Sequence, residues 1–253
     1  MRTKRIALYF VALLGVATCA LSLALVFGVD WDKRHHTRAV MRIFDADGQP
    51  LERKLARLAG VGLTQDEATA IAGKYGSSAV PSFSKCLTTP GCDPAAQSMA
   101  CLVLAKTPGV EGRDAIMAHI KERLSARELT REQTRVLTFS MMALGQIADE
   151  VSLKLLEDLV GRSYWQPPQV TPVLHRYPGE EDLTGDKART FLRQTAMSAG
   201  FGNVARERQP EILMILRRLR DGEASDIYGQ VDFEILNTER YLASRPSRLK
   251  ATP

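Results

Sequence analysis

Two stretches of this sequence share one pattern, and that pattern decides the fold. Residues 141–160 read MMALGQIADEVSLKLLEDLV, and residues 196–219 read AMSAGFGNVARERQPEILMILRRL. Each begins with small apolar residues and a glycine, Gly145 in the first and Gly202 in the second. Each then passes through a polar turn into a second segment with apolar residues at helical spacing. The pattern predicts repeated helical hairpins.

Two weaker copies of the pattern precede these stretches. AIAGKYGSSAVPSFSKCL, residues 70–87, has Gly73 in the place of the glycine. CLVLAKTPGVEGRDAIMAHIKERL, residues 101–124, has Ala105 there. A single hairpin cannot bury both of its apolar faces, whereas stacked neighbours share a continuous core. We therefore predict an all-α fold, an α-solenoid of three to four helical hairpins.

Small residues end the first helix of the two clearest copies. The set consists of Ala143, Gly145, Ala199, Gly200 and Gly202. Because small side chains permit close backbone approach, we expect them to let the second helix of the same hairpin turn back tightly.

Helix starts are marked by capping signals. Thr64 with Glu67, and Thr130 with Gln133, have the spacing of capping boxes. Asp93 stands directly before a proline, as an N-cap residue does. These signals predict helices that begin just after residues 64, 93 and 130.

The stretch around Gly145 resembles a HEAT repeat, in the short bacterial form seen in the HEAT-like repeats of phycobilisome lyases. That pattern reads A-x-x-A-L-G-x-I-G-D, followed by A-hydrophobic-x-x-L. The matching residues are Ala143, Leu144, Gly145, Ile147 and Asp149, and Ala148 stands where the family favours glycine. The resemblance covers residues 64–219 and is closest over 133–160. It implies an α-solenoid, whose members mostly bind other proteins, although a few are lyases or DNA-repair enzymes.

The N-terminus carries an apolar segment long enough to cross a membrane. Residues 6–28 are 23 residues without a charge, which as a helix would span roughly 34 Å against a hydrocarbon core of about 30 Å. We interpret the segment as an uncleaved signal anchor. Two alternatives are cleavage after ATCA (residues 17–20) and lipidation at Cys19.

The charges beside this segment do not decide its orientation by themselves, since both flanks are basic. A short basic tail of five residues precedes it, and such a tail usually stays inside. We therefore expect residues 30–253 outside the cytoplasm, in the periplasm of a bacterium. The expected parts are a signal anchor at 1–29, a juxtamembrane linker at 30–50, a helical repeat domain at 51–240 and a basic tail at 241–253.

An insertion at residues 161–186 lengthens the last repeat spacing. It holds four prolines and is expected to be a structureless loop on a binding face. Its candidate partner-binding residues are Tyr164, Trp165, His175 and Tyr177. The alternative is that Trp165 and Tyr177 pin the loop to the adjacent helices.

A run of arginines forms a second candidate contact surface. Its partner-binding candidates are Arg206, Arg208, Arg217 and Arg218, with Arg220 beside them. Such a patch suits phosphate, anionic lipid or an acidic partner, and the alternative is a solvated polar helix face. The net charge of +5 falls to about +2 without Arg2, Lys4 and Arg5, so charge disfavours nucleic acid as a partner.

Three of the four cysteines lie between residues 86 and 101. Cys86 and Cys92 flank a Pro-Gly turn that can bring their Cα atoms within disulfide range, and outside the cytoplasm we expect them to pair. Cys101 lies in an apolar helix and is expected in the core. A zinc site lacks a fourth ligand nearby.

No motif in the sequence indicates catalysis. There is no H-E-x-x-H, G-x-S-x-G or phosphate-binding glycine loop, and we predict no catalytic residues, cofactor or metal. His119 is expected to be a packed or surface histidine. We predict a membrane-anchored protein-binding scaffold or adaptor. The alternative is a lyase or hydrolase on a HEAT-like scaffold, which would need Glu180, Glu181, His175 or Arg206 to gather in one cleft.

Overall fold

The computed structural model describes residues 35–43, 48–49, 51–58, 63–89, 91–166, 170–204 and 208–244. The chain divides into two compact units, Met1–Gln49 and Pro50–Pro253. In the first unit, residues 35–43 are helical. The predicted membrane segment at 6–28 lies outside the described residues, and within them no helix has the length and apolar character needed to cross a membrane.

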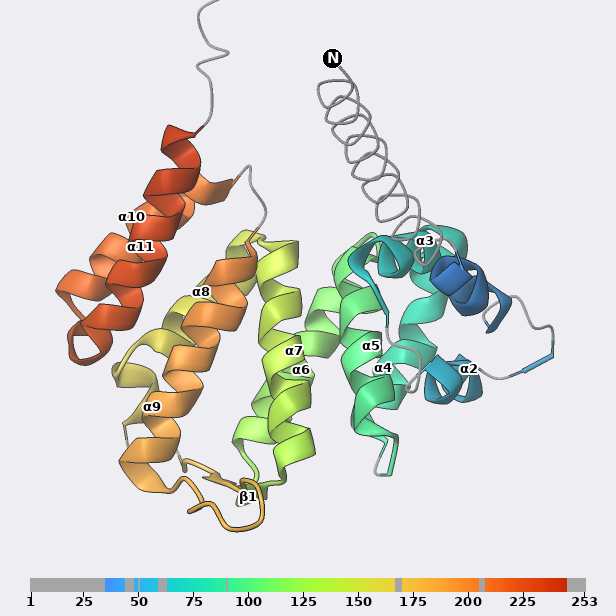
Figure 1. Ribbon diagram of the computed structural model, residues 1–253, viewed down its shortest axis with the longest axis horizontal. Helices are drawn as coiled ribbons and strands as arrows, with labels where there is room; N and C mark the ends of the chain where they lie inside the picture. Colours follow the sequence, from blue (N-terminus) through green and yellow to red (C-terminus); the bar gives the residue numbers. More distant parts are fainter. Residues whose placement is uncertain are drawn as a thin grey trace, which may run out of the picture. The chain divides into compact units, whose positions relative to one another are not determined.

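The second unit is mostly helical, which confirms the all-α class (Figure 1). Its α-helices are α2 (Leu51–Leu58), α3 (Gln65–Tyr75), α4 (Val80–Thr88), α5 (Pro94–Lys106), α6 (Glu111–Leu124), α7 (Arg131–Ile147), α8 (Glu150–Val160), α9 (Gly185–Thr195), α10 (Gln209–Asp221) and α11 (Tyr228–Ala243). Shorter 3-10 turns are η1 (Gly76–Ala79), η2 (Ser163–Trp165), η4 (Phe201–Asn203) and η6 (Ser225–Ile227), and η3 (Ala196–Gly200) is a π-helical turn.

The predicted helix starts are confirmed. Thr64 and Glu67 form a complete capping box before α3, and Thr130 and Gln133 form another before α7. Asp93 caps α5 by accepting a hydrogen bond from the backbone N–H of Ala95 at 2.7 Å. Each cap supplies an acceptor to a backbone N–H that has no partner inside its helix.

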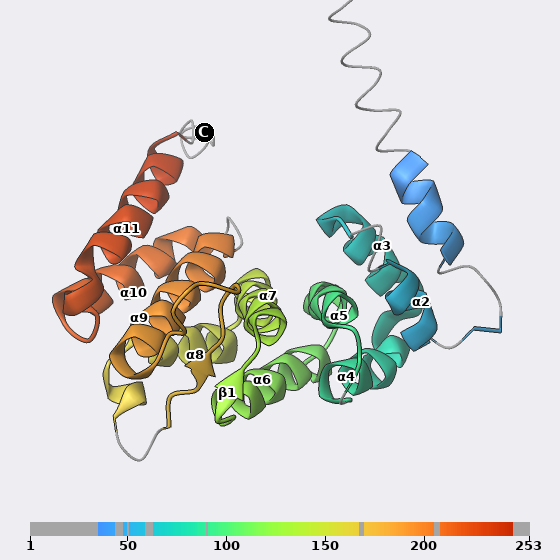
Figure 2. The same ribbon diagram turned by 60° about the horizontal axis from the view of Figure 1, so that its bottom comes forward.

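The helices of the second unit lie in two layers that follow the chain (Figure 2). In one layer α3 lies beside α5, α5 beside α7, and α7 beside η3, which continues α9. In the other, α4 lies beside α6, and α8 beside α10. α5 contacts α6 and α7 contacts α8, the helices that follow them in sequence, whereas α10 packs chiefly against α11. The main contacts are therefore made between elements close in sequence.

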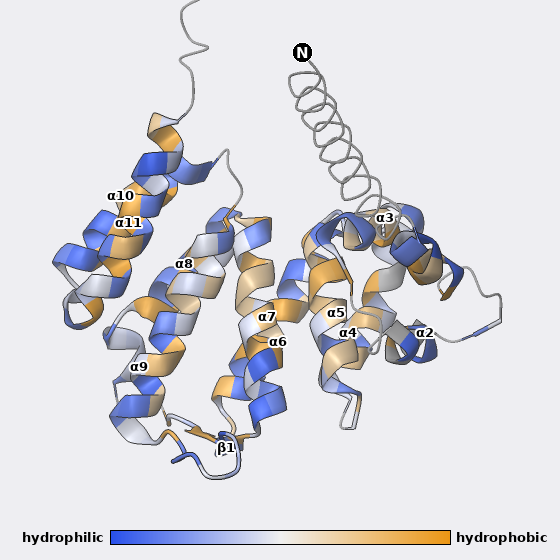
Figure 3. Cartoon of the chain, viewed as in Figure 1, coloured by the Kyte–Doolittle hydropathy of each residue, from blue (hydrophilic) through white to orange (hydrophobic). Residues whose placement is uncertain are grey.

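The core lies between the two layers. α5 is enclosed on all sides, since every residue from Ala96 to Leu104 is buried, and Figure 3 colours it mostly hydrophobic. Around it lie fully buried side chains of the neighbouring helices, among them Phe83, Leu87, Ile116, Ile120 and Leu137. Burying a side chain of this size contributes about 1.5–3 kcal/mol.

The small residues permit close contacts between neighbouring hairpins, whereas we expected them to permit close contact within one hairpin. A Cβ atom on Gly145 would stand 2.0 Å from the carbonyl oxygen of Gly200. Gly145 lies in the last turn of α7, and Gly200 ends η3, the neighbouring element of the same layer. The expectation that Gly145 admits its own second helix, α8, is therefore wrong. Gly200 does face α8, because a Cβ there would stand 2.5 Å from Leu156 Cδ2.

Ala148 stands at a position that glycine would suit better. It is the C-cap of α7 and has a left-handed backbone, with φ 51° and ψ 27°. Glycine adopts that conformation without steric cost, whereas an L-residue with a Cβ pays about 1–2 kcal/mol. The chain thus makes this turn with a residue that is less suited to it than glycine.

The insertion at 161–186 is ordered where it is described, so the expectation of a structureless loop is wrong. Strand β2 (Val173–Leu174) pairs in parallel with β1 (Glu128–Leu129), which precedes α7. Leu174 and Leu183 also exchange backbone hydrogen bonds at 2.9 and 3.0 Å. Each strand has only two residues, too short for an alternating pattern to reveal it in the sequence.

Candidate functional site

A groove lies between α7, α9 and the part of the insertion that joins β2 to α9. We call it the α7–α9 groove. Its deeper part is a cavity of about 360 Å³. A hollow of about 500 Å³ along α9 shares Arg176, Leu183 and Phe191 with it. The cavity is lined by Arg131, Thr134, Arg135, Thr138, Leu174, His175, Arg176, Tyr177, Glu180, Leu183 and Phe191.

One wall of the groove is a single face of α7. Arg131, Thr134, Arg135 and Thr138 recur at three- and four-residue spacing, which places them on one side of the helix. The threonine hydroxyls donate back to the carbonyls of Thr130 and Thr134 at 3.0 Å. The two arginines therefore supply the unused hydrogen-bond donors of this wall.

Neither arginine is neutralised by a carboxylate of the described residues. The guanidinium of Arg131 lies 3.5 Å from the ring centroid of Tyr177. That of Arg135 lies 6.0 Å from the ring of Phe139. Most other arginines of the second unit that the structure describes have an acidic partner, for instance Arg113 with Asp149 at 2.7 Å. The α7 wall is thus a locally uncompensated positive surface.

The rest of the lining is mainly apolar. It includes Leu174, Leu183, Tyr177 and Phe191 of α9, together with the ion pair of Arg176 and Glu180. Phe191 is 38% exposed and Tyr177 is 52% exposed. Large apolar side chains gathered at a concave surface mark binding sites more often than scattered ones do.

His175 holds the insertion in place beside this groove. Its Nδ1 lies 2.8 Å from Asp182 Oδ2, and its Nε2 lies 3.2 Å from Glu128 Oε2. The hydrogen bond to Asp182, and then that to Glu128, raise the pKa of His175 above its ordinary value. The pKa of Asp182 is lowered, first by the backbone N–H of Arg176 and then by His175. His175, predicted to contact a partner, thus also ties β1 to the insertion.

Glu180 and Glu181, which the enzyme hypothesis named, pair with separate basic side chains. Arg176 pairs with Glu180 at 2.9 Å, and Lys187 pairs with Glu181 at 3.1 Å. Arg206 lies outside the described residues. Among the described residues, His175 and Glu180 both line the α7–α9 groove, whereas Glu181 does not, and His175 hydrogen-bonds to Asp182 and Glu128 and not to either glutamate of this pair.

Trp165 and Tyr164 lie apart from the α7–α9 groove. The Trp165 ring is 3% exposed, and its Nε1–H donates to the carbonyl of Leu159 at 2.9 Å. Tyr164 meets it edge-on, with the ring centroids 5.1 Å apart. Trp165 thus anchors the insertion to the end of α8, as the alternative interpretation proposed, while Tyr177 stays exposed.

The predicted arginine patch is internally neutralised where the structure describes it. Arg217 pairs with Glu239 at 2.7 Å, and Arg218 Nε lies 2.9 Å from Glu157 Oε1. The other ion pairs are Arg208 with Glu211 and Arg220 with Asp221. These side chains lie outside the lining of the groove, and their pairing matches the solvated-face alternative.

Two of the cysteines pair, as the Pro-Gly turn between them suggested. Cys86 and Cys92 form a disulfide between the end of α4 and the start of α5, with Cα atoms 5.9 Å apart. Cys101 is a free thiol in the core, and burial raises its pKa to about 12. His119 is fully buried, and burial lowers its pKa to about 4, which keeps it neutral.

No family model, curated protein or solved structure matches this chain. The HEAT resemblance therefore rests on the residues from Ala143 to Asp149 alone. Within the described ranges, no group of three or more His, Cys, Asp or Glu side chains is arranged so that it could hold a metal ion.

Sequence reasoning missed the residues that form the groove. Arg131 and Arg135 stand four residues apart on a predicted helix, a spacing that places them on one face. What it does not reveal is that this face stays free of acidic partners. Phe191 gave no signal of its own.

Proposed function

We propose that this chain is a protein-binding scaffold whose α7–α9 groove takes an acidic segment with apolar side chains from its partner. The observation that carries the proposal is the position of Arg131 and Arg135, without carboxylate partners, beside the exposed rings of Phe191 and Tyr177. Carboxylates of a partner would pair with the arginines, and its apolar side chains would cover the rings.

The finer fold proposal is an α-solenoid of HEAT-like hairpins. The hairpins would be α3 with α4, α5 with α6, α7 with α8, and α9 with α10. Their first helices follow one another in one layer, which supports the proposal. In such an array, insertions lie on one face and often form the binding surface. The insertion of this chain supplies part of the lining of the groove.

The proposed setting is the outer face of a membrane. Residues 6–28 would be the signal anchor, with the C-terminal domain outside the cytoplasm. The disulfide between Cys86 and Cys92 supports this placement, because disulfides persist in oxidising compartments.

The test compares groove variants for recovery of a partner. The full chain, tagged at Pro253, is captured from solubilised membranes as wild type, as the Arg131→Glu/Arg135→Glu double variant and as Phe191→Ser. The matched controls are Arg217→Glu and Met214→Ser on α10, where Met214 is 66% exposed. A partner that binds the groove is lost from the first two variants and retained by the controls. Equal recovery from all five chains would refute the proposal.

A further inference from the structure

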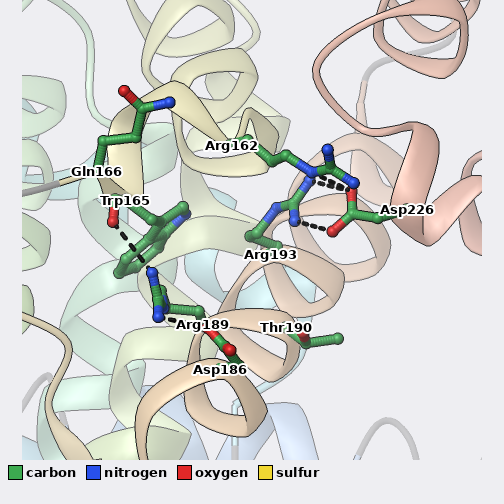
Figure 4. A pocket seen from close by; sticks show the side chains of 8 residues that line it. All are labelled: Arg162, Trp165, Gln166, Asp186, Arg189, Thr190, Arg193 and Asp226. Atoms are coloured by element: carbon green, nitrogen blue, oxygen red, sulfur yellow. Dashed lines mark hydrogen bonds and ion pairs between the residues drawn. The ribbon is translucent and has the colours of Figure 1, made fainter.

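A second cavity lies on α9 next to the hollow of the α7–α9 groove, with which it shares Asp186 and Thr190, and it shares no residue with the 360 Å³ cavity of that groove. It has a volume of about 470 Å³. It is lined by Arg162, Trp165, Gln166, Asp186, Arg189, Thr190, Arg193 and Asp226 (Figure 4). The lining comes from η2, α9 and η6 and the residues next to them. Three arginines thus meet at one cavity beside a tryptophan.

Arg193 forms the fixed back of this cavity. Its side chain is 5% exposed. Nε donates to the carbonyl of Val160 at 2.7 Å, and Nη2 donates to the carbonyl of Glu223 at 2.9 Å. Both Nη atoms also donate to Asp226, at 2.6 and 2.9 Å. Arg193 is therefore occupied by structural contacts.

Arg162 pairs with the same carboxylate and keeps unused N–H donors. Its Nε lies 3.2 Å from Asp226 Oδ1, so two guanidinium groups share one aspartate (Figure 4). The Arg162 side chain is 54% exposed. A guanidinium has five N–H donors. The Nη groups of Arg162 are therefore available to a ligand that enters from solvent.

Arg189 faces the cavity with an unmatched donor. One Nη pairs with Asp186, and the other donates to the carbonyl of Trp165 at 3.4 Å. Its Nε is buried and has no acceptor among the described residues. A buried N–H without an acceptor is costly, so native structures rarely leave one. The accessible donors are the remaining N–H groups of the two Nη atoms, because a guanidinium has five N–H donors and the Arg189 side chain is 36% exposed.

The charges around the cavity specify the kind of oxyanion. Arg162, Arg189 and Arg193 carry three positive charges, and Asp186 and Asp226 carry two negative ones, which leaves +1. A carboxylate brings this to zero, whereas a phosphate dianion would leave −1 beside two aspartates. The cavity is also larger than a carboxylate alone needs, and Trp165 offers it an apolar wall.

We propose that this cavity binds an organic monocarboxylate, with its oxygens placed between Arg162 and Arg189 and its apolar part against Trp165. The carboxylate can belong to a small free acid or to the C-terminus of a peptide. The chemistry of recognition is the same for both. The site shares no residue with the 360 Å³ cavity whose arginines carry the proposed function, so it can be tested independently of that function.

Trp165 provides the readout. The chain has two tryptophans, so Trp31→Phe leaves Trp165 as the sole indole. The purified full chain with this change is titrated with phenylacetate, with an N-acetylated tripeptide as free acid and as amide, and with inorganic phosphate. We expect saturable changes in Trp165 fluorescence for a carboxylate, and at least about tenfold weaker binding of the amide and of phosphate. The acid that binds more tightly, phenylacetate or the tripeptide, identifies whether the carboxylate belongs to a small free acid or to a peptide C-terminus.

Three variants in the same background locate the binding. Arg162→Gln and Arg189→Gln each weaken carboxylate binding by at least about tenfold, while Arg217→Gln, on an exposed ion pair elsewhere, leaves it unchanged. If Arg189→Gln does not fold, the test rests on Arg162→Gln alone, a change at a half-exposed side chain. The proposal is overturned if acid and amide bind alike, if phosphate binds as tightly as the acids, if the arginine variants bind as wild type, or if no acid binds below about 10 mM.

Discussion

Gly145 and Gly200 touch backbone to backbone, where α7 meets the π-helical turn that ends α9. A Cβ atom on Gly145 would stand 2.0 Å from the carbonyl oxygen of Gly200. That carbonyl cannot swing aside as a flexible side-chain end can. The contact therefore sets the spacing of two neighbouring first-layer elements, and through them the position of α9 beside the α7–α9 groove.

Replacing Gly145 by alanine should destabilise the fold. The added methyl forces α7 and η3 apart, and overpacking of this kind costs about 1–3 kcal/mol. The matched control is Gly73→Ala in α3, where a Cβ would meet nothing within 4 Å. That change should stabilise by up to about 1 kcal/mol through helix propensity. Urea unfolding of both variants, followed by circular dichroism, measures the difference. Equal stability of the two would contradict the close contact.

Replacing Ala148 by glycine should not destabilise, although the alanine is buried. Relief of the left-handed backbone, worth about 1–2 kcal/mol, offsets the lost methyl and the added freedom of the unfolded chain. The control is Ala143→Gly in the middle of α7, which should cost about 1 kcal/mol or more. A loss at position 148 as large as that at position 143, measured by the same unfolding experiment, would argue against the observed turn.

The pair Arg193–Asp226 should make stability depend on acid. The hydrogen bond from Arg193 lowers the pKa of Asp226 from its ordinary 3.8 to about 2. A lowered pKa contributes stability that is complete above about pH 4 and is lost as pH falls towards 2. The melting temperature of the wild type should therefore fall between pH 5 and pH 2 by an amount that Asp226→Asn does not show. That variant begins less stable, because it lacks the contribution of the carboxylate at every pH. Parallel curves for both chains would refute this role of Asp226.

His175 should hold the insertion more tightly at low pH than at high pH. Its pKa is raised by Asp182 and Glu128, so its contribution is complete below about pH 6.5 and is lost as pH rises through its folded-state pKa. The amide of Leu174, which donates to Leu183, reports this as a hydrogen-exchange protection factor. Protection should fall as the pH rises above about 6.5 in the wild type and stay constant in His175→Gln. A constant value in the wild type would contradict the histidine tether.

Local signals in the sequence predicted much of the fold. The capping boxes at Thr64 and Thr130 involve residues three apart, so the helix starts could be recognised without knowledge of the tertiary structure. The Cys86–Cys92 turn is likewise short-range. The contact between Gly145 and Gly200 joins elements far apart in the chain, and the sequence showed only that both residues are small.

The candidate site was predicted less well, for the same reason. The insertion was identified as a binding region, and His175 and Tyr177 do line the groove. Trp165 points elsewhere, because its ring is more stable buried against α8 than exposed in a loop. The importance of Arg131 and Arg135 depends on which acidic residues the fold brings near them, and that is a tertiary property.

The most direct test of the central claim is photo-crosslinking from inside the α7–α9 groove. p-Benzoylphenylalanine is placed at position 191, which conserves an aromatic ring, and separately at position 214, an exposed site on α10. Both chains are irradiated in intact membranes. The account predicts a defined adduct from position 191, absent when Arg131→Glu and Arg135→Glu are added, and none from position 214. No adduct at position 191, or the same adduct from both positions, would contradict it.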